Sequence, residues 1–161
     1  NESFYSSYVY YFGGKKIPKK LQSITKQNFL NNLINCVQRA LEIDIKKLVS
    51  IEAHRQTKGQ KVEIHNDYDY TSKGYPNIRL VWNLNGRSML KKGGNFCFRS
   101  QRNRVIKRFP VIKNSAILFK ISQSSYHSID EIQSGVRDVI VFSFWSKRKK
   151  VSKDEICFYP Q

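Results

Sequence analysis

The chain has 161 residues with 29 Lys or Arg against 12 Asp or Glu, which gives a formal net charge of +17 and a pI near 10. This length favours one domain, residues 1–161, around one hydrophobic core, and a start at Asn1 is compatible with a piece of a longer chain. No apolar run reaches the roughly 18 residues that a membrane-spanning helix needs. Three scattered cysteines without a Cys-x-x-Cys pair argue against a disulfide framework or a zinc knuckle, so we expect a cytoplasmic protein.

Short segments with β-type patterns dominate the chain. Residues 7–12 are aromatic and β-branched and precede a Gly-Gly pair, which predicts a strand and a turn. From about Ile24 to Leu41, apolar residues recur at three- and four-residue spacing, which predicts an amphipathic helix that covers one side of a core. The spacing of the later segments favours a mostly β protein with an antiparallel sandwich or jelly roll and the helix on one outer face. These segments are 47–56, 61–67, 78–85, 95–100, 104–112, 116–121, 126–132, 136–145 and 155–159.

The chain has three histidines, His54, His65 and His127, so a histidine-based site has few possible members. The strand-like stretch 62–67 places His65 and Asp67 on one face, because side chains two residues apart in a strand point the same way. Such a pair can bind a cation, although alone it is more often a hydrogen-bonded surface pair. His54, on an alternating segment before this pair, is interpreted as a surface or packing residue.

The His-x-Asp pair gains weight because it is the first of four features in a fixed order. It is followed by a Gly-Gly pair at 93–94, then His127, then Arg137 ten positions later. From about Gln56 to Trp145, the chain resembles the iron(II)- and 2-oxoglutarate-dependent oxygenases of the prolyl-hydroxylase type. The motifs that carry the resemblance are 57–67 (a glycine, five residues and His-x-Asp), 79–85 (an arginine-led strand ending in Leu-Asn), 93–98 (the Gly-Gly strand), 110–119 with 125–129 (the approach to the distal histidine) and 135–145 (a strand opened by the basic residue).

The resemblance implies a double-stranded β-helix in which His65, Asp67 and His127 bind Fe(II) and leave positions open for 2-oxoglutarate and O2. Arg137 would pair with the far carboxylate of 2-oxoglutarate, a role that suits a planar guanidinium that keeps its proton. The implied reaction converts 2-oxoglutarate to succinate and CO2 and hydroxylates a C–H bond. Because Asp67 occupies the position that a halide would need, we expect a hydroxylase and not a halogenase.

The sequence departs from the family pattern at two positions around the co-substrate. Gln56 stands where many members carry a tyrosine, so the usual phenol contact is absent or supplied elsewhere, and Asn83 puts an amide where an apolar residue or tyrosine is commoner. Arg79 and Tyr68 are candidates for the substrate or co-substrate pocket, although an arginine at a strand start is at least as often solvated. The glycines at 93–94 serve mainly to fix the register.

The substrate stays open between a small molecule, a glycan and a peptide, and the positive charge favours an anionic one only weakly. The alternative function is a non-catalytic basic β-sandwich that binds nucleic acid, with Tyr68, Tyr70 or Tyr75 stacking on bases. Against a nucleic-base demethylase stands Ser143, at the position where those relatives carry a second arginine. A cupin-like enzyme ranks last, because such sites need more histidines. We expect no membrane span, and the oligomeric state stays open.

Overall fold

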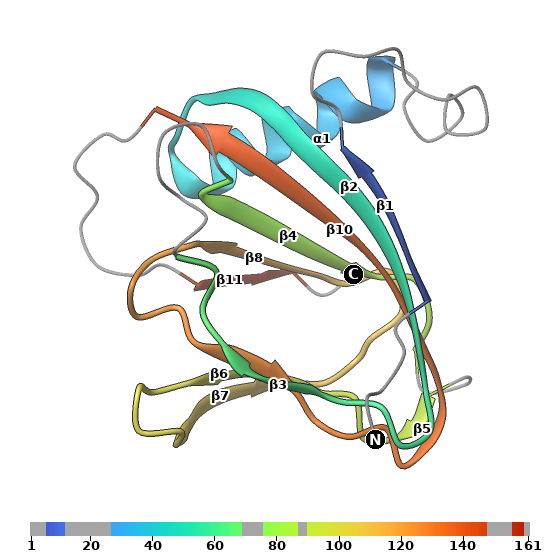
Figure 1. Ribbon diagram of the computed structural model, residues 1–161. Helices are drawn as coiled ribbons and strands as arrows, with labels where there is room; N and C mark the ends of the chain where they lie inside the picture. The colour runs from blue at the N-terminus through green and yellow to red at the C-terminus, as the bar shows by residue number, and fades with distance from the viewer. Residues whose placement is uncertain (1–5, 12–26, 69–75, 87–89, 148–155, 160–161) are drawn as a thin grey trace.

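The computed structural model describes residues 6–11, 27–68, 76–86, 90–147 and 156–159. Two antiparallel β-sheets face each other in this part of the chain, and one helix covers the outer face of the larger sheet (Figure 1). Within these ranges, no helix is long and apolar enough to cross a membrane. Residues 24–26, where the helix was expected to begin, and Tyr70 and Tyr75 lie outside the described residues.

The larger sheet is organised around β10 (Ser134–Ser146), which pairs with β2 on one side and β4 on the other. Six of its seven described strands run in the order β1-β2-β10-β4-β8-β11. The seventh, β5, pairs with the first residues of β10. The other bounds are β1 (Ser6–Tyr11), β2 (Ile45–Thr57), β4 (Ile78–Asn83), β5 (Leu90–Lys92), β8 (Ala116–Lys120) and β11 (Ile156–Tyr159).

The smaller sheet has four described strands in the order β3-β9-β6-β7. Their bounds are β3 (Val62–His65), β6 (Phe96–Arg99), β7 (Val105–Phe109) and β9 (His127–Ile129). Two facing antiparallel sheets with these crossovers form a jelly roll, which confirms the predicted fold class. The sequence did not predict β5, a three-residue strand that reads Leu-Lys-Lys and carries no clear alternation.

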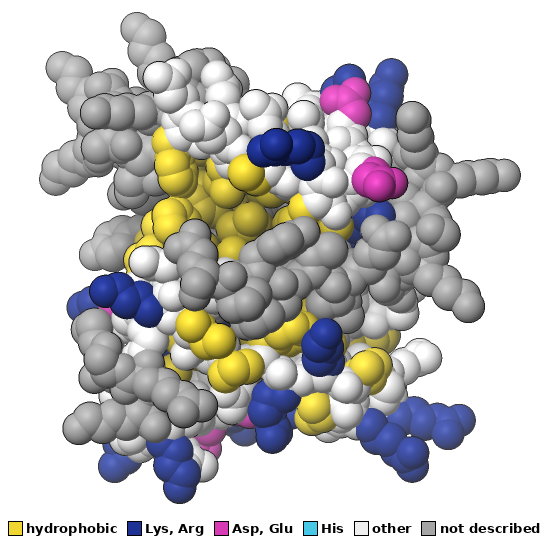
Figure 2. Space-filling model, turned by 180° about the vertical axis from the view of Figure 1, so that it is seen from behind, with side chains coloured by type: hydrophobic (Ala, Val, Ile, Leu, Met, Phe, Trp, Pro, Cys, Tyr) yellow, Lys and Arg dark blue, Asp and Glu magenta, His cyan; other side chains and the backbone are white. Residues whose placement is uncertain are grey.

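Helix α1 (Gln27–Leu41) confirms the amphipathic pattern. Val37 and Leu41 are buried against the outer face of the larger sheet, and the ring of Phe29 stacks on Trp82 with centroids 5.9 Å apart. A groove of about 650 Å3 runs beside the helix over β4 and β8. On the face seen in Figure 2, apolar side chains gather in a hollow while Lys and Arg side chains are scattered, so the positive charge does not form one block there.

The space between the sheets is filled by an aromatic core. Phe96, Phe98, Phe109 and Phe119 make edge-on or tilted ring contacts with one another, and Phe96 and Phe98 come from the strand next to β9. Buried aromatic side chains of this kind contribute much of the apolar area removed from water and fix the separation of the sheets. The core therefore holds one end of the smaller sheet rigidly against the larger one, and the candidate site lies beside it.

Candidate metal centre

A cavity of about 430 Å3 lies between the two sheets. One wall consists of side chains from β2, β4 and β10, and the opposite wall consists of side chains from β3, β6 and β9. The apolar part of the lining includes Val62, Phe96 and Ile129. The polar part gathers the residues that the sequence singled out, so the chemistry of the cavity depends on how these side chains face one another.

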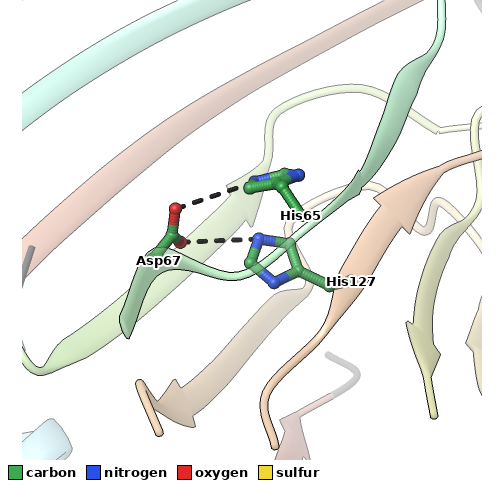
Figure 3. Close-up of side chains that lie close together, drawn as sticks. All are labelled: His65, Asp67 and His127. Atoms are coloured by element: carbon green, nitrogen blue, oxygen red, sulfur yellow. Dashed lines mark ion pairs between the residues drawn. The ribbon is translucent and has the colours of Figure 1, made fainter. Parts of the chain in front are cut away.

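His65 and His127 meet across two neighbouring strands. His65 is the last residue of β3, His127 is the first residue of β9, and the two are direct partners in the register. Their ring centroids are 4.2 Å apart. Figure 3 shows both rings turned toward Asp67, which follows β3 by two residues. The pairing of strands that are more than 60 residues apart in sequence thus brings the three side chains together.

Both imidazoles are fixed by the same backbone contact. His65 Nδ1 lies 2.9 Å from the carbonyl oxygen of Glu63, and His127 Nδ1 lies 2.8 Å from that of Ser125. A carbonyl oxygen only accepts, so each Nδ1 carries the hydrogen and donates it. Each neutral ring therefore presents the unprotonated Nε2 toward Asp67. Contacts of this kind orient the histidine ligands of metal ions in proteins.

Asp67 completes the cluster. One carboxylate oxygen, Oδ1, is 3.7 Å from His65 Nε2, and the other, Oδ2, is 3.5 Å from His127 Nε2. Both distances exceed those of an ordinary N–H···O hydrogen bond, and Oδ2 is buried without a hydrogen-bond partner among the described residues. One donor atom from each of the three side chains lies within 4.8 Å of the others.

Burial sets the protonation state of His127. Its side chain is 7% exposed, and its ring stacks on Phe96 at a centroid distance of 5.3 Å. Burial, followed by the charge of His65, lowers the pKa of His127 to about 4. The ring is therefore neutral at neutral pH, which is the form that binds metals.

The three side chains fit a divalent cation. Two nitrogen lone pairs and a carboxylate converge on one point, and no proton lies between them when both rings are neutral. Such an arrangement is unfavourable unless a cation occupies the centre, because a buried carboxylate oxygen without a partner costs free energy. Two imidazoles and one carboxylate on one face form the donor set of non-haem Fe(II) sites with open positions.

Arg137 on β10 lies in the same cavity. It is 3% exposed, and its Nη1 donates to Gln56 Oε1 at 2.6 Å. Its Nε and Nη2 have no hydrogen-bond partner among the described residues. Burial lowers the pKa of Arg137 to about 10, so the guanidinium still carries its charge at neutral pH. A buried cation with two unpaired N–H groups is a receptor for a carboxylate.

The two glycines at 93–94 have a steric reason beyond setting the register. Gly94 has a φ of +69°, and a Cβ there would lie 2.9 Å from a methyl carbon of Leu90 and 3.4 Å from Cδ of Arg137. At Gly93, with a φ of +87°, a Cβ would overlap the carbonyl oxygen of Glu131. Glycine is the residue that tolerates both the conformation and the close approach. The pair therefore shapes the wall behind Arg137.

Arg79, predicted as a pocket residue, lines the cavity, and its Nε lies 3.5 Å from Asp67 Oδ2. Tyr68 is partly buried and packs against the aromatic core beside Asp67. The contact to a co-substrate proposed for Tyr68 stays a prediction. Asn83, the unusual amide, is buried at the end of β4 and donates to Ser115 Oγ at 3.0 Å, which gives its amide nitrogen a partner.

Sequence reasoning missed two cavity residues on β2. Glu52 and His54 line the cavity together with Gln56, and Glu52 Oε2 lies 3.3 Å from His54 Nε2. The three positions differ by two residues each, so they share the inner face of the strand. The alternation of 50, 52, 54 and 56, all polar, was the signal that could have located them. His54 is thus a cavity residue rather than a surface residue.

Comparison with known proteins gives the following matches. Residues 51–147 match the family model described as the 2OG-Fe(II) oxygenase superfamily. A search of curated protein sequences gave no match.

Solved structures share the fold at low sequence identity. An oxidoreductase of the 2OG-Fe(II) oxygenase family from Burkholderia pseudomallei has a TM-score of 0.62 at 18% identity over 80% of this chain and 56% of that one. A prolyl hydroxylase from Trichoplax adhaerens, in complex with a peptide fragment of the hypoxia inducible factor oxygen degradation domain, has a TM-score of 0.62 at 16% identity. The match covers 87% of this chain and 63% of that one. A viral collagen prolyl hydroxylase from Paramecium Bursaria Chlorella virus-1 has a TM-score of 0.61 at 17% identity. The match covers 89% of this chain and 80% of that one. The chain thus spans less than two thirds of the first two structures.

Proposed function

The chain belongs to the 2OG-Fe(II) oxygenase superfamily, and on that basis we propose that it is an iron(II)- and 2-oxoglutarate-dependent hydroxylase in which His65, Asp67 and His127 bind the metal. One observation carries the proposal. His65 and His127 line the same cavity as Arg137, a buried guanidinium without a carboxylate partner among the described residues, and Asp67 converges with the two histidines. Each feature costs free energy without a ligand, and together they suit the metal and the co-substrate that the family uses.

The ligand residues have distinct roles. His65 and His127 supply neutral nitrogen donors whose orientation is set by their Nδ1–H bonds to backbone carbonyls. Asp67 supplies the single anionic oxygen donor and takes the position that a halide would need, which favours hydroxylation over halogenation. When bound, Fe(II) supplies the activation of O2 that couples decarboxylation of 2-oxoglutarate to oxidation of a C–H bond.

Arg137 would bind the far carboxylate of 2-oxoglutarate through the Nε and Nη2 hydrogens. Gln56 keeps the guanidinium from rotating because its Oε1 accepts from Nη1 at 2.6 Å. Gln56 thus acts at the position of the expected tyrosine, but as an orienting group for the arginine. The apolar side chains of Val62, Phe96 and Ile129 limit the access of water around the reacting groups.

The test is to add Fe(II) to the protein without oxygen and to titrate 2-oxoglutarate while recording the visible spectrum. We expect a weak metal-to-ligand charge-transfer band that is lost in His127→Ala and needs at least tenfold more 2-oxoglutarate in Arg137→Ala. Arg55→Ala is the matched control, because Arg55 has a 62% exposed side chain and pairs with Asp138 outside the cavity.

Absence of the band, together with no iron binding by the intact chain, would contradict the proposal. The basic β-sandwich that binds nucleic acid would then become the leading account. In that case the affinity for DNA or RNA should fall steeply with salt and should not depend on His127 or Arg137.

A further inference from the structure

Glu52 is an acidic side chain in the cavity that the proposed metal and co-substrate sites do not use. Its side chain is 17% exposed. It lies on the inner face of β2 next to Val141 of β10, which in turn pairs with Val81 of β4. In a chain with a formal charge of +17, a carboxylate that faces inward and away from the many surface cations requires a reason.

The carboxylate is held in place from its own strand. Ser50 Oγ donates to Glu52 Oε1 at 2.9 Å, and His54 Nε2 lies 3.3 Å from Oε2. An ionised carboxylate offers about four acceptor sites. Two partners therefore fix its position and leave acceptor capacity directed into the cavity. A group that is oriented by neighbours and still able to accept is suited to recognise a hydrogen-bond donor.

A hydrogen-bond donor faces the cavity from the other side of β10. Arg79 pairs with Ser143 of β10, which in turn pairs with Ser50 of β2. Arg79 therefore lies on the same inner face as Glu52, two residues along β4 from Val81. Its Nε is buried without a hydrogen-bond partner among the described residues, and it lies 3.5 Å from Asp67 Oδ2. Glu52 and Arg79 thus offer one acceptor and one donor on either side of β10, and Arg79 lies beside the candidate metal ligand Asp67.

The formal charges of the loaded cavity cancel. The charges of Fe(II), Asp67, Arg137 and doubly ionised 2-oxoglutarate add to zero, and those of Arg79 and Glu52 also cancel, with the histidines neutral. A charged target group would enter a partly apolar cavity with no counter-charge left for it, which is costly. A neutral group with one N–H and one C=O meets both available partners without that cost.

We propose that Glu52 and Arg79 bind an uncharged amide of the target molecule, with Glu52 accepting from its N–H and Arg79 donating to its C=O. This inference rests on the proposed function and assigns the chemistry of the target at that site. Ser50 and His54 are positioning residues for Glu52. On the face seen in Figure 2 the Lys and Arg side chains are scattered, so we assign the choice of the group that enters the cavity to Glu52 and Arg79.

The test uses protein loaded with Zn(II) and 2-oxoglutarate, which binds without turning over, and ligand-observed NMR. Three sets of small probes carry the same uncharged amino-acid side chains. They are N-acetyl methylamides, which are neutral, free-amine methylamides, which are cationic, and N-acetyl acids, which are anionic. Binding of 2-oxoglutarate is measured first for every variant, so that loss of loading is distinguished from loss of target binding.

We expect the neutral set to bind at least tenfold more tightly than either charged set. Glu52→Gln keeps an acceptor and should bind the neutral set within threefold of the wild type, whereas Glu52→Leu should lose at least tenfold. Glu52→Val takes the place of the leucine variant if that one does not load. Asp44→Leu is the control, because Asp44 has a 63% exposed side chain and pairs with Lys46.

Four outcomes would overturn the inference. They are tighter binding of a charged set, equal binding of the neutral set by all variants, an equal loss in Glu52→Gln and Glu52→Leu, and no binding of any set by loaded wild type. If the wild type does not load with Zn(II) and 2-oxoglutarate, the proposed function fails, and the charge balance fails with it.

Discussion

Replacing Arg137 by methionine should stabilise the ligand-free protein while it weakens binding of 2-oxoglutarate. Burial lowers the pKa of Arg137 to about 10, more than two pH units below that of an arginine in water, which corresponds to about 3 kcal/mol held against the charged form. The folded-state pKa is the lower one, so this cost is fully present below about pH 10 and fades as the pH rises further. A measurement at neutral pH therefore records all of it.

The substitution also removes a favourable contact. Losing the hydrogen bond from Nη1 to Gln56 costs about 1 kcal/mol, and methionine fills most of the space of the arginine stem. The net expectation is a variant about 2 kcal/mol more stable, with a Tm about 4–8 °C higher for a domain of this size. Binding of 2-oxoglutarate should weaken roughly 100-fold, because charge-assisted hydrogen bonds contribute about 1.5–3 kcal/mol each.

Urea unfolding of the ligand-free proteins measures the first effect, and the same experiment with Zn(II) and saturating 2-oxoglutarate measures the second. Ligand should raise the midpoint of the wild type by an amount that grows with its concentration and should raise that of Arg137→Met much less. Arg55→Met is the control: Arg55 is exposed and paired, so its loss should change stability little. A less stable ligand-free Arg137→Met would refute the view that this guanidinium is held without a carboxylate partner.

Three further predictions concern the metal centre, the glycine pair and the helix. Asp67→Asn removes the anionic donor and should weaken Co(II) binding at least tenfold by calorimetry, whereas Asp44→Asn, at an exposed carboxylate, should not change it; equal affinities would remove Asp67 from the ligand set. Gly94→Ala should destabilise more than Gly59→Ala, since both have positive φ but only Gly94 meets neighbours within 4 Å, and chemical denaturation that ranks them in reverse would contradict the steric argument. Leu41→Ala should lower the free energy of unfolding by about 2–5 kcal/mol, because Leu41 is buried between α1 and the larger sheet. Leu84→Ala, at a 37% exposed side chain, should lower it by less than about 0.5 kcal/mol. A small effect at Leu41 would show that α1 contributes little to the fold.

The sequence by itself determined the local elements and the identity of the candidate ligands. A three- and four-residue period predicted α1, and a two-residue period predicted nearly all strands, because these repeats follow directly from the geometry of one helix or one strand. The same period placed His65 and Asp67 on a common face. His127 was added by the order of the motifs and their resemblance to the oxygenase family, and the presence of only three histidines in the chain left few other candidates.

The tertiary structure alone decided which distant side chains face each other. Gln56 and Arg137 are 81 residues apart, and their contact follows from the register in which β2 pairs with β10. The contact of Arg79 with Asp67 follows in the same way from the approach of the two sheets. A shift of one residue in either pairing would turn every second side chain to the other face, and no local pattern records which register forms. For that reason the sequence could name the candidate metal ligands, while the orienting partner of Arg137 and the cavity position of Glu52 appear only once the sheets are assembled.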